Sequence, residues 1–200
     1  NKADEVRNLL ASKKVIMANI ISSPGAGKTT LLEKTCERIC KEVRVGIIEG
    51  DITTDLDAQR LRKYDIPIVM INTEGGCHLD SHSISKVLDT FDLENTDLLF
   101  VENVGNLICP SQFDLGESFK VAMVSTPEGD DKPAKYPMLF REAGVVLLNK
   151  TDLLPYTNFD IARFRADLRL INNDVPLLDV SCTTGDGLEN WYNWILGKLL

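Results

Sequence analysis

The chain has 200 residues, with 22 basic and 30 acidic side chains and a net charge of −8 at pH 7. A chain of this length buries roughly 70% of its unfolded surface, enough core for one domain over residues 1–200 without disulfide staples. The acidic balance argues against nucleic-acid binders and anionic-membrane binders, because both need basic surface. No apolar run approaches the ~18 residues of a membrane span. Five cysteines, an odd number, favour a reducing compartment, the cytoplasm.

Strands and helices are predicted to alternate along almost all of the chain, after a short amphipathic helix within residues 1–13. Apolar runs of the kind found in strands buried on both faces predict seven strands: 15–22, 43–50, 66–73, 97–104, 118–126, 143–150 and 175–181. Helices are predicted from the first Gly-rich turn to Cys40 and over 53–64, 80–91, 159–172 and 188–200. This order predicts an α/β fold with a mostly parallel sheet and helices on both faces. One long irregular stretch, 105–117, is expected to be functional.

A phosphate-binding loop is predicted between the first strand and the helix that follows it. The segment from Ser22 to Thr29 reads SSPGAGKT, which matches the pattern except that Ser22 replaces the first glycine. Small residues let backbone N–H groups turn inward around a phosphate, Lys28 reaches the β and γ phosphates, and the Thr29 hydroxyl ligates Mg²⁺. The alternative is a chance Gly-rich turn. The pattern predicts a P-loop NTPase fold in which the nucleotide contacts Pro24, Gly25, Ala26, Gly27, Lys28, Thr29 and Thr30.

A guanine-binding motif is predicted at the end of a buried strand, where residues 149–152 read NKTD. This string resembles the guanine-reading motif of P-loop GTPases, in which a carboxylate, here that of Asp152, accepts from guanine N1–H and N2–H₂. Adenine would leave that carboxylate unpaired, a costly mismatch. The Lys150 stem is expected to pack on the base and Asn149 to tie the motif to the phosphate loop. A plain strand-end turn is the alternative. A second base-contacting loop is expected at Ser181, Cys182 and Thr183, although it lacks the Ala-Lys pair common there.

Acidic residues at two strand ends are the expected partners of Mg²⁺. Asp51 follows the second strand and Glu102 lies near the end of the fourth, and Mg²⁺ takes one or two carboxylates together with phosphates. The string ENVG from Glu102 to Gly105 resembles the DxxG switch segment with Glu in place of Asp. No Gln follows Gly105 to orient a water molecule, so slow intrinsic GTP hydrolysis is expected. Lys28, Thr29, Asp51 and Glu102 are the predicted catalytic residues.

Two thiols and one or two imidazoles are predicted to share the nucleotide's edge of the sheet. Cys77, His78 and His82 follow the third strand and Cys109 follows the fourth, and parallel strands send these loops to one edge. Thiolate and imidazole together suit Zn²⁺ and Ni²⁺. The spacing lacks a CxxC pair, so an open site, or one completed by a second copy of the chain, is expected. The alternative is a buried cysteine and a surface histidine, and packing is the expected role of Cys36, Cys40 and Cys182.

The whole set of motifs resembles the HypB family of GTPases. The matching strings are SSPGAGKTTLL, EGDITTDLDAQR, GCHLD, ENVGNLICP, FDLGE, EGDDKPAKYP and NKTDLLP, with a weaker match in SCTTGDGL. The resemblance implies Mg²⁺-dependent GTP hydrolysis to GDP in service of nickel delivery to a [NiFe]-hydrogenase large-subunit precursor, together with a maturation accessory protein. It also implies a nucleotide- or metal-dependent homodimer. Cys77, His78 and Cys109 carry over as Ni²⁺ or Zn²⁺ ligands, with His82 a weaker candidate.

Three other functions stay open on the residues alone. The related urease accessory GTPases share the architecture but would show a Cys-Pro-His metal motif, whereas this chain has Gly-Cys-His and Cys-Pro in separate places. A P-loop kinase or synthetase would need an acceptor pocket and would not need NKTD. A zinc-bridged scaffold would depend on Cys77 for dimers and would not hydrolyse GTP.

Overall fold

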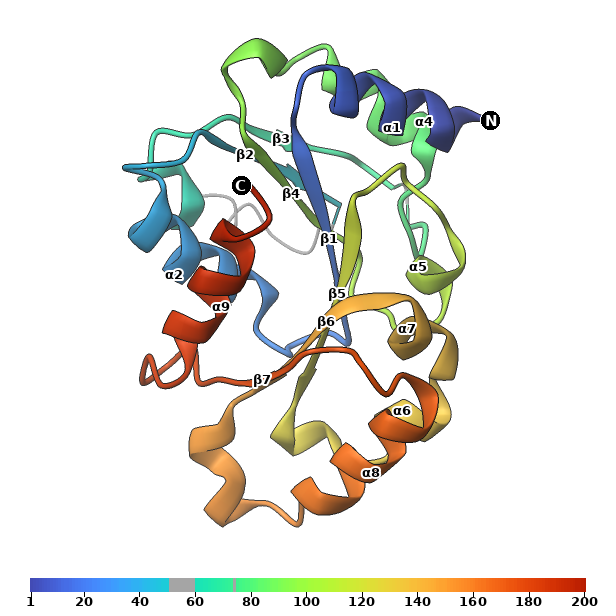
Figure 1. Ribbon diagram of the computed structural model, residues 1–200, viewed down its shortest axis with the longest axis vertical. Helices are drawn as coiled ribbons and strands as arrows, with labels where there is room; N and C mark the ends of the chain where they lie inside the picture. The colour runs from blue at the N-terminus through green and yellow to red at the C-terminus, as the bar shows by residue number, and fades with distance from the viewer. Residues whose placement is uncertain (51–59, 74) are drawn as a thin grey trace.

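The described residues of the computed structural model, 1–50, 60–73 and 75–200, form one seven-stranded sheet with helices on both faces (Figure 1). The strands are β1 Ile16–Ser22, β2 Val45–Glu49, β3 Ile68–Met70, β4 Leu98–Glu102, β5 Phe119–Ser125, β6 Ala143–Asn149 and β7 Leu177–Asp179. The α-helices are α1 Lys2–Ser12, α2 Lys28–Ile39, α4 Ser81–Leu88, α5 Cys109–Gln112, α6 Lys132–Lys135, α7 Pro137–Glu142, α8 Ile161–Ile171 and α9 Leu188–Leu196. Short 3₁₀ turns are η1 Leu93–Asn95, η2 Thr126–Glu128 and η3 Thr151–Tyr156.

The sheet is parallel throughout, in the strand order β3-β2-β4-β1-β5-β6-β7. β1 lies in the middle, with Ile20 beside Glu102 of β4 on one side and Val121 of β5 on the other. Because the strands run the same way, the segments that follow β1, β2, β4 and β6 leave one edge of the sheet, where ligands bind in open α/β folds. The predicted parallel α/β architecture is confirmed.

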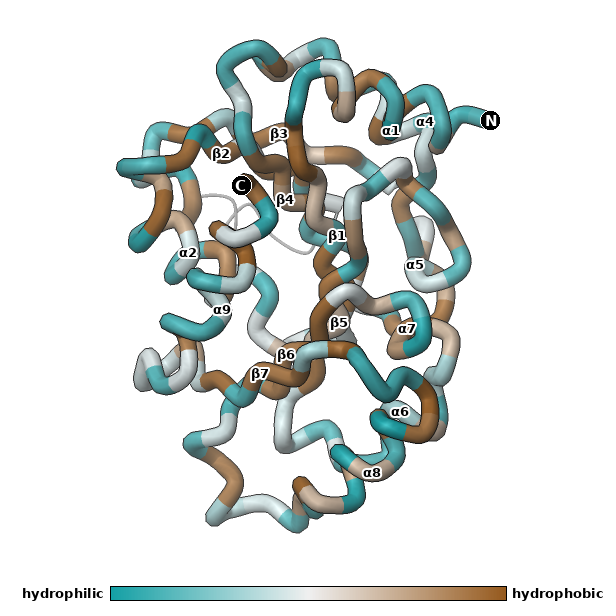
Figure 2. Tube along the Cα trace, in the orientation of Figure 1, coloured by the Kyte–Doolittle hydropathy of each residue, from teal (hydrophilic) through white to brown (hydrophobic). Residues whose placement is uncertain are grey.

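The strands of the sheet are largely apolar, as the brown of their tube shows (Figure 2). Their side chains pack between the sheet and two helical layers. Ala18 and Ile20 of β1 face a core built with α2 and α9. Met17 and Ile21 face the opposite side, into cores built with α1, α4, α7 and α8. This alternation follows from the two-residue period of a strand, and it explains why β1 reads as an unbroken apolar run.

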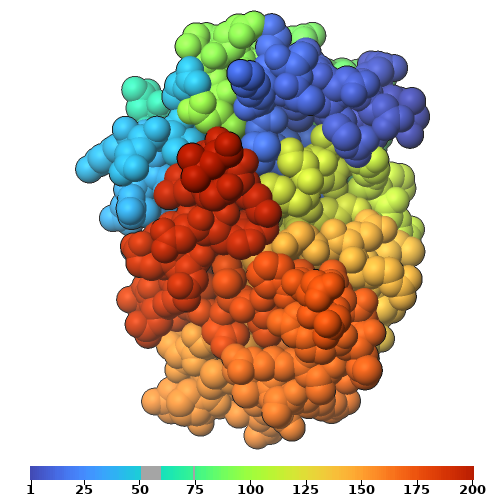
Figure 3. All heavy atoms as spheres, viewed as in Figure 1, coloured from blue at the N-terminus to red at the C-terminus, as the bar shows by residue number. Residues whose placement is uncertain are grey.

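The C-terminal helix α9 packs beside α2 on one face of the sheet (Figure 1), and the red surface of the C-terminal segment lies next to the blue of α2 (Figure 3). Trp191 of α9 is fully buried, and its Nε1–H donates to Thr35 Oγ1 of α2 at 2.9 Å. The Tyr192 hydroxyl donates to the Lys34 carbonyl at 3.2 Å. In the described residues, no helix combines the length and the apolar character that a bilayer crossing requires.

The two edge strands are shorter than predicted, because each pairs on one side only. β3 and β7 each have three residues, whereas longer strands were predicted over 66–73 and 175–181. The stretch 105–117, predicted to be irregular, contains the single turn α5, with Pro110 in its first turn. The helix predicted over 53–64 lies mostly outside the described residues.

Candidate functional site

A cavity of about 540 Å³ lies at the carboxyl edge of the sheet, over the loop between β1 and α2. Its lining comprises Pro24, Gly25, Gly27, Lys28, Thr29, Thr30, Glu49, Arg60, Glu102, Val104, Gly105 and Lys150. Gly25 and Gly27 both have positive φ, at 75° and 108°, a conformation that glycine adopts without a steric penalty. The loop therefore has the backbone shape that the sequence pattern predicted.

Ser22, which departs from the phosphate-loop pattern, has a visible structural role. Its Oγ accepts a hydrogen bond from Lys28 Nζ at 3.2 Å and donates to the Ser23 carbonyl at 2.8 Å. Lys28 is only 5% exposed, so its ammonium group is held at the base of the loop, where it lines the cavity. A glycine at position 22 would lack the hydroxyl that accepts from Lys28.

Two buried carboxylates face the cavity from neighbouring strands. Glu49 and Glu102 are paired in register at the ends of β2 and β4, and they are 1% and 3% exposed. Thr29 Oγ1 donates to Glu102 Oε1 at 2.8 Å. Two ionised carboxylates on neighbouring strands would repel each other, and a divalent cation would offset that repulsion. The hydroxyl and carboxylate oxygens are the hard donors that Mg²⁺ prefers, so the residues present fit that ion.

Glu49 was missed by the sequence analysis, which chose Asp51 two residues later. Asp51 lies outside the described residues. The signal for Glu49 was its place as the last residue of a buried strand, the same place that Glu102 holds in β4. Arg60 was also missed; it lines the cavity while its guanidinium donates to Thr30 Oγ1 at 3.3 Å and pairs with Glu33.

Asn149 joins the end of β6 to two other loops. Its Nδ2 donates to the Ala26 carbonyl of the phosphate loop at 2.9 Å, and its Oδ1 accepts from the Cys182 N–H at 3.0 Å. A Cβ on Gly27 would lie 2.5 Å from Asn149 Nδ2, so glycine is required for this close approach. Burial raises the pKa of the Cys182 thiol to about 12, which fits the predicted packing role of this residue.

The remaining residues of the NKTD motif also meet the neighbouring loops. Lys150 has φ 61°, unusual for a residue with a Cβ, and its Nζ donates to the Gly25 carbonyl at 2.6 Å. Asp152 Oδ1 accepts from the buried Ser181 hydroxyl at 2.6 Å. Thr183 is exposed beside it. The two predicted base-contacting loops therefore lie together, and the first of them is joined to the phosphate loop.

The thiols of Cys77 and Cys109 lie together although 32 positions separate them in the sequence. The nearby Cys109 thiol raises the pKa of the Cys77 thiol above its ordinary value. Cys77 Sγ also lies 3.6 Å from His78 Nδ1. Across the described residues, no three or more His, Cys, Asp and Glu side chains are already arranged to hold a metal ion. The pairs that meet offer sulfur and nitrogen donors of the kind that suit Ni²⁺ and Zn²⁺.

The imidazole of His82 is exposed in the first turn of α4, whereas His78 lies in the loop before that helix. Asp80 begins that helix as its N-cap. The Ser83 N–H, at 2.7 Å, holds the pKa of the Asp80 carboxyl below its usual range, with smaller contributions from the His82 and His78 charges. His82 therefore shares a charged neighbour with His78.

Phe113 is a further residue of this region that the sequence analysis missed. Its ring stacks on that of His78, with centroids 3.7 Å apart and an interplanar angle of 14°. Only the general expectation that the stretch 105–117 is functional pointed to it.

Comparison with known proteins identifies the family. Residues 16–179 match the family model CobW/HypB/UreG, nucleotide-binding domain. The hydrogenase maturation factor HypB of Escherichia coli K12 is 46% identical over 96% of this chain; the chain spans about two thirds (67%) of that protein's length. The crystal structure of hydrogenase maturation factor HypB from Archaeoglobus fulgidus has a TM-score of 0.94 and 40% identity, covering 100% of this chain and 97% of that one.

A second solved structure, HypB from Helicobacter pylori in complex with nickel, has a TM-score of 0.91 and 36% identity, covering 99% of this chain and 93% of that one. The similarity therefore extends over the sheet, the cavity and the thiol-bearing loops. This chain belongs to the HypB family, within the CobW/HypB/UreG group of nucleotide-binding domains.

Proposed function

We propose that this protein binds and hydrolyses GTP and uses the nucleotide cycle to handle nickel for [NiFe]-hydrogenase maturation. One observation carries the nucleotide assignment: Asn149 and Lys150 of the NKTD motif both donate to carbonyls of the phosphate loop. Those two contacts set the base-reading loop and the phosphate-reading loop side by side, as one nucleoside triphosphate requires.

The guanine base would be read by Asp152. Its carboxylate already accepts a hydrogen bond from Ser181 on one oxygen, which holds the side chain toward the second loop. A fixed acceptor selects the N1–H and N2–H₂ donors of guanine over the N1 acceptor of adenine. Ser181, Cys182 and Thr183 would complete the base pocket, with Lys150 moving from Gly25 to lie along the ring.

The phosphates would lie in the cavity over Gly25, Ala26 and Gly27, where Lys28 neutralises charge on the β and γ groups. Mg²⁺, when bound, neutralises charge on the same phosphates; Thr29, Glu102 and Glu49 would hold it. Asp51 remains a proposed partner of this ion. Water then attacks the γ phosphorus and GDP leaves with inorganic phosphate, at a slow intrinsic rate because no glutamine follows Gly105 to orient the water.

Nickel would be the cargo, bound by Cys77, His78 and Cys109 with His82 as a further ligand. The open arrangement in one chain supports completion of the site by a second copy, in a homodimer that depends on nucleotide, metal or both. The names of the relatives, hydrogenase maturation factors, support a role in hydrogenase maturation. Delivery to a large-subunit precursor together with an accessory protein is part of this proposal. The five cysteines are free thiols, which fits the reducing cytoplasm.

The test combines gel filtration, metal analysis and nucleotide hydrolysis on the wild type and three variants. Cys77→Ala and Cys109→Ala should lose Ni²⁺ binding, and with it any metal-dependent dimer, while keeping GTP binding. Cys40→Ala is the matched control, because it removes a thiol at the end of α2 by the same substitution. It should keep both Ni²⁺ binding and GTP binding.

Three results would contradict the proposal. Turnover of ATP with a small acceptor would indicate a kinase or synthetase. Loss of dimers in Cys77→Ala without any GTP hydrolysis in the wild type would indicate a zinc-bridged scaffold. Equal Ni²⁺ binding by all four proteins would remove the thiols from the metal site.

A further inference from the structure

A chain of buried side-chain amides runs beneath the cavity, from the end of β4 across β1. Asn103 and Asn19 are fully buried, and Asn103 Nδ2 donates to Asn19 Oδ1 at 3.0 Å. Asn19 Nδ2 in turn donates to Glu117 Oε1 at 3.2 Å. Buried polar groups of this kind cost free energy unless they are paired, so each link depends on the next.

The direction of this hydrogen-bond chain is fixed at both ends. Asn103 Oδ1 accepts from two backbone donors, the N–H of Leu79 at 3.3 Å and that of Val104 at 2.9 Å. The Asn103 amide nitrogen must therefore point the other way, to Asn19. At the far end the Glu117 carboxylate also accepts from the Leu115 N–H at 2.7 Å. Neither amide can flip without setting two donors or two acceptors against each other.

The Leu79 N–H belongs to the loop that carries the proposed metal ligands Cys77 and His78, called the metal loop below. Leu79 follows Cys77 and His78 directly, and its side chain is 1% exposed. A Cβ on Gly50 would lie 2.6 Å from Leu79 Cδ1, so Leu79 also packs on the backbone that follows Glu49. One residue of this loop thus contacts the ends of both strands that carry the cavity's carboxylates.

The backbone of Asn103 is connected to the proposed nucleotide site. Asn103 follows Glu102, which accepts the Thr29 hydroxyl, and its own N–H donates to the Ile20 carbonyl of β1 at 3.1 Å. A shift of the Glu102 backbone, such as contact with a γ phosphate would cause, moves the Asn103 side chain with it. The Leu79 N–H, which donates to Asn103 Oδ1, would feel such a shift.

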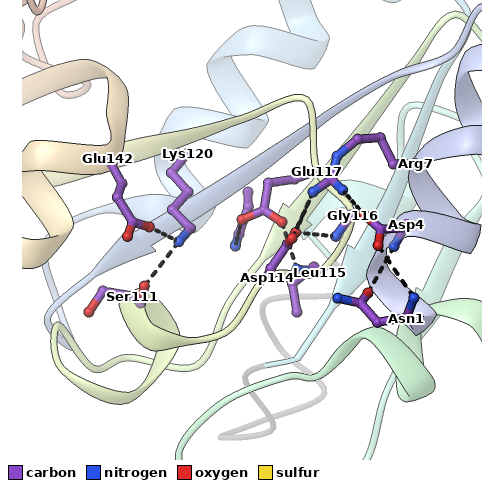
Figure 4. A network of polar contacts seen from close by, with 11 residues as sticks. Asn1, Asp4, Arg7, Ser111, Asp114, Leu115, Gly116, Glu117, Lys120 and Glu142 are labelled. Carbon is purple, nitrogen blue, oxygen red and sulfur yellow. Dashed lines mark hydrogen bonds and ion pairs between the residues drawn. The ribbon is translucent and has the colours of Figure 1, made fainter.

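The segment from Phe113 to Glu117 is tied to itself and to α1 by hydrogen bonds. Figure 4 shows Glu117 bonded to Leu115, and Asp114 bonded to both Gly116 and Arg7 of α1. The same segment carries Phe113, whose ring covers that of His78. The loop that carries Cys77 and His78 therefore has two contacts: the Phe113 ring on His78, and Asn103 on the Leu79 N–H.

We propose that Asn103 is a positioning residue that couples the nucleotide state to Ni²⁺ affinity, through its hydrogen bond to the Leu79 N–H. The proposal rests on the function proposed above. Allosteric coupling is the ratio of affinities in two states, and reciprocity requires the metal to change nucleotide affinity by the same factor. Removing Asn103 should erase that ratio without removing a ligand of either site.

The experiment measures Ni²⁺ affinity by competition with a chromogenic chelator, on protein saturated with Mg²⁺·GDP or with a non-hydrolysable Mg²⁺·GTP analogue. We expect a ratio of about 5-fold or more for the wild type, the low end of typical couplings. Asn103→Ala should bring the ratio to within 2-fold of one. Asn103→Ser, whose hydroxyl can still accept from the Val104 N–H, gives the same readout with less structural loss if the alanine variant does not fold.

Phe113→Leu is the matched control, because it removes the ring from His78 but leaves the amide chain intact. It should weaken Ni²⁺ binding equally in both nucleotide states and keep the wild-type ratio. A wild-type ratio of one overturns the proposed nucleotide-gated function and this inference together. A wild-type ratio of 5-fold or more that survives Asn103→Ala and Asn103→Ser, or that Phe113→Leu abolishes equally, overturns this inference alone.

Discussion

Asp152 illustrates how a single carboxylate is prepared for its partner. The Ser181 hydroxyl, itself fully buried, donates to one oxygen at 2.6 Å, and it also accepts the Thr184 N–H at 3.1 Å. These bonds set the direction of the side chain before a ligand arrives, which lowers the entropy lost on binding. A residue held this way discriminates by donor and acceptor pattern rather than by size.

Asp152→Asn should exchange guanine for xanthine specificity. The asparagine amide would donate where the carboxylate accepted, which opposes the guanine N2–H₂ group and suits the O2 acceptor of xanthine. Loss of a paired hydrogen bond at such a site costs about 1–3 kcal/mol, or roughly 5- to 150-fold in GDP affinity. Fluorescence titration with GDP and XDP measures the change. Unchanged GDP affinity in Asp152→Asn would contradict the assignment of the base.

At the scale of elements, α2 and α9 are joined by a hydrogen bond inside an apolar core. Thr35 Oγ1 donates to the Leu31 carbonyl at 2.6 Å and accepts from Trp191 Nε1 at 2.9 Å, so this hydroxyl uses both of its capacities. Thr35 and Trp191 are both fully buried. If this acceptor is removed, the buried indole N–H is left without a hydrogen-bond partner, because water does not reach it.

Thr35→Val should therefore lower the free energy of unfolding by about 1–3 kcal/mol, the cost of a buried donor left without its acceptor. Chemical denaturation gives the value. A double-mutant cycle with Trp191→Phe separates this cost from the loss of packing, because the double variant no longer buries an unpaired donor. Strictly additive losses would show that the bond contributes nothing of its own.

The bounds of the interior strands were predictable to within a few residues, because a strand buried on both faces has a continuous run of apolar residues. The same logic failed at the edges, where β3 and β7 pair on one side and run for three residues each. The short helices α6 and α7 were missed because four to six residues hold too few turns to show a period.

At the scale of the whole molecule, the phosphate loop and the Cys77 and Cys109 thiols lie at one edge of the sheet because every strand points the same way. The phosphate loop, the NKTD motif and the Cys77–His78 pair were predictable, since each is a local string placed at a strand end. Asn103 and Phe113 were not, because their contacts join segments far apart in sequence and only the fold brings them together. Glu49 carries the signal of a buried strand's last residue, but its pairing with Glu102 depends on the strand order.

The opposite edge of the sheet is held by ion pairs, of which Asp97 with Arg44 is the most fully bonded. The Asp97 carboxylate accepts from the Arg44 backbone N–H and from its guanidinium, which ties the starts of β2 and β4 together. The Arg44 side chain holds the pKa of Asp97 below its ordinary value of 3.8. A carboxyl with a lowered folded-state pKa stabilises the native state above its ordinary pKa.

Asp97→Asn should lower the free energy of unfolding at pH 7 by a small amount, because the pair is partly open to solvent. The difference from wild type should stay constant down to about pH 5 and shrink as pH falls through the folded-state pKa, where the wild-type carboxyl takes up its proton. Denaturation curves between pH 7 and pH 3 measure it. Asp89→Asn, at an exposed position after α4, is the control for removing a surface carboxylate. If the stability difference between wild type and Asp97→Asn grew as the pH fell, the lowered pKa of Asp97 would be contradicted.

The fixed direction of the amide chain has a consequence for how this protein can change over evolutionary time. Asn19, Asn103 and Glu117 each take their donor or acceptor role from the next residue, so a replacement at one position strands a buried group at another. Related sequences should therefore exchange these three residues jointly and rarely one at a time. The pair at positions 19 and 103, 84 places apart in the sequence, should stand out as covarying when many homologues are aligned.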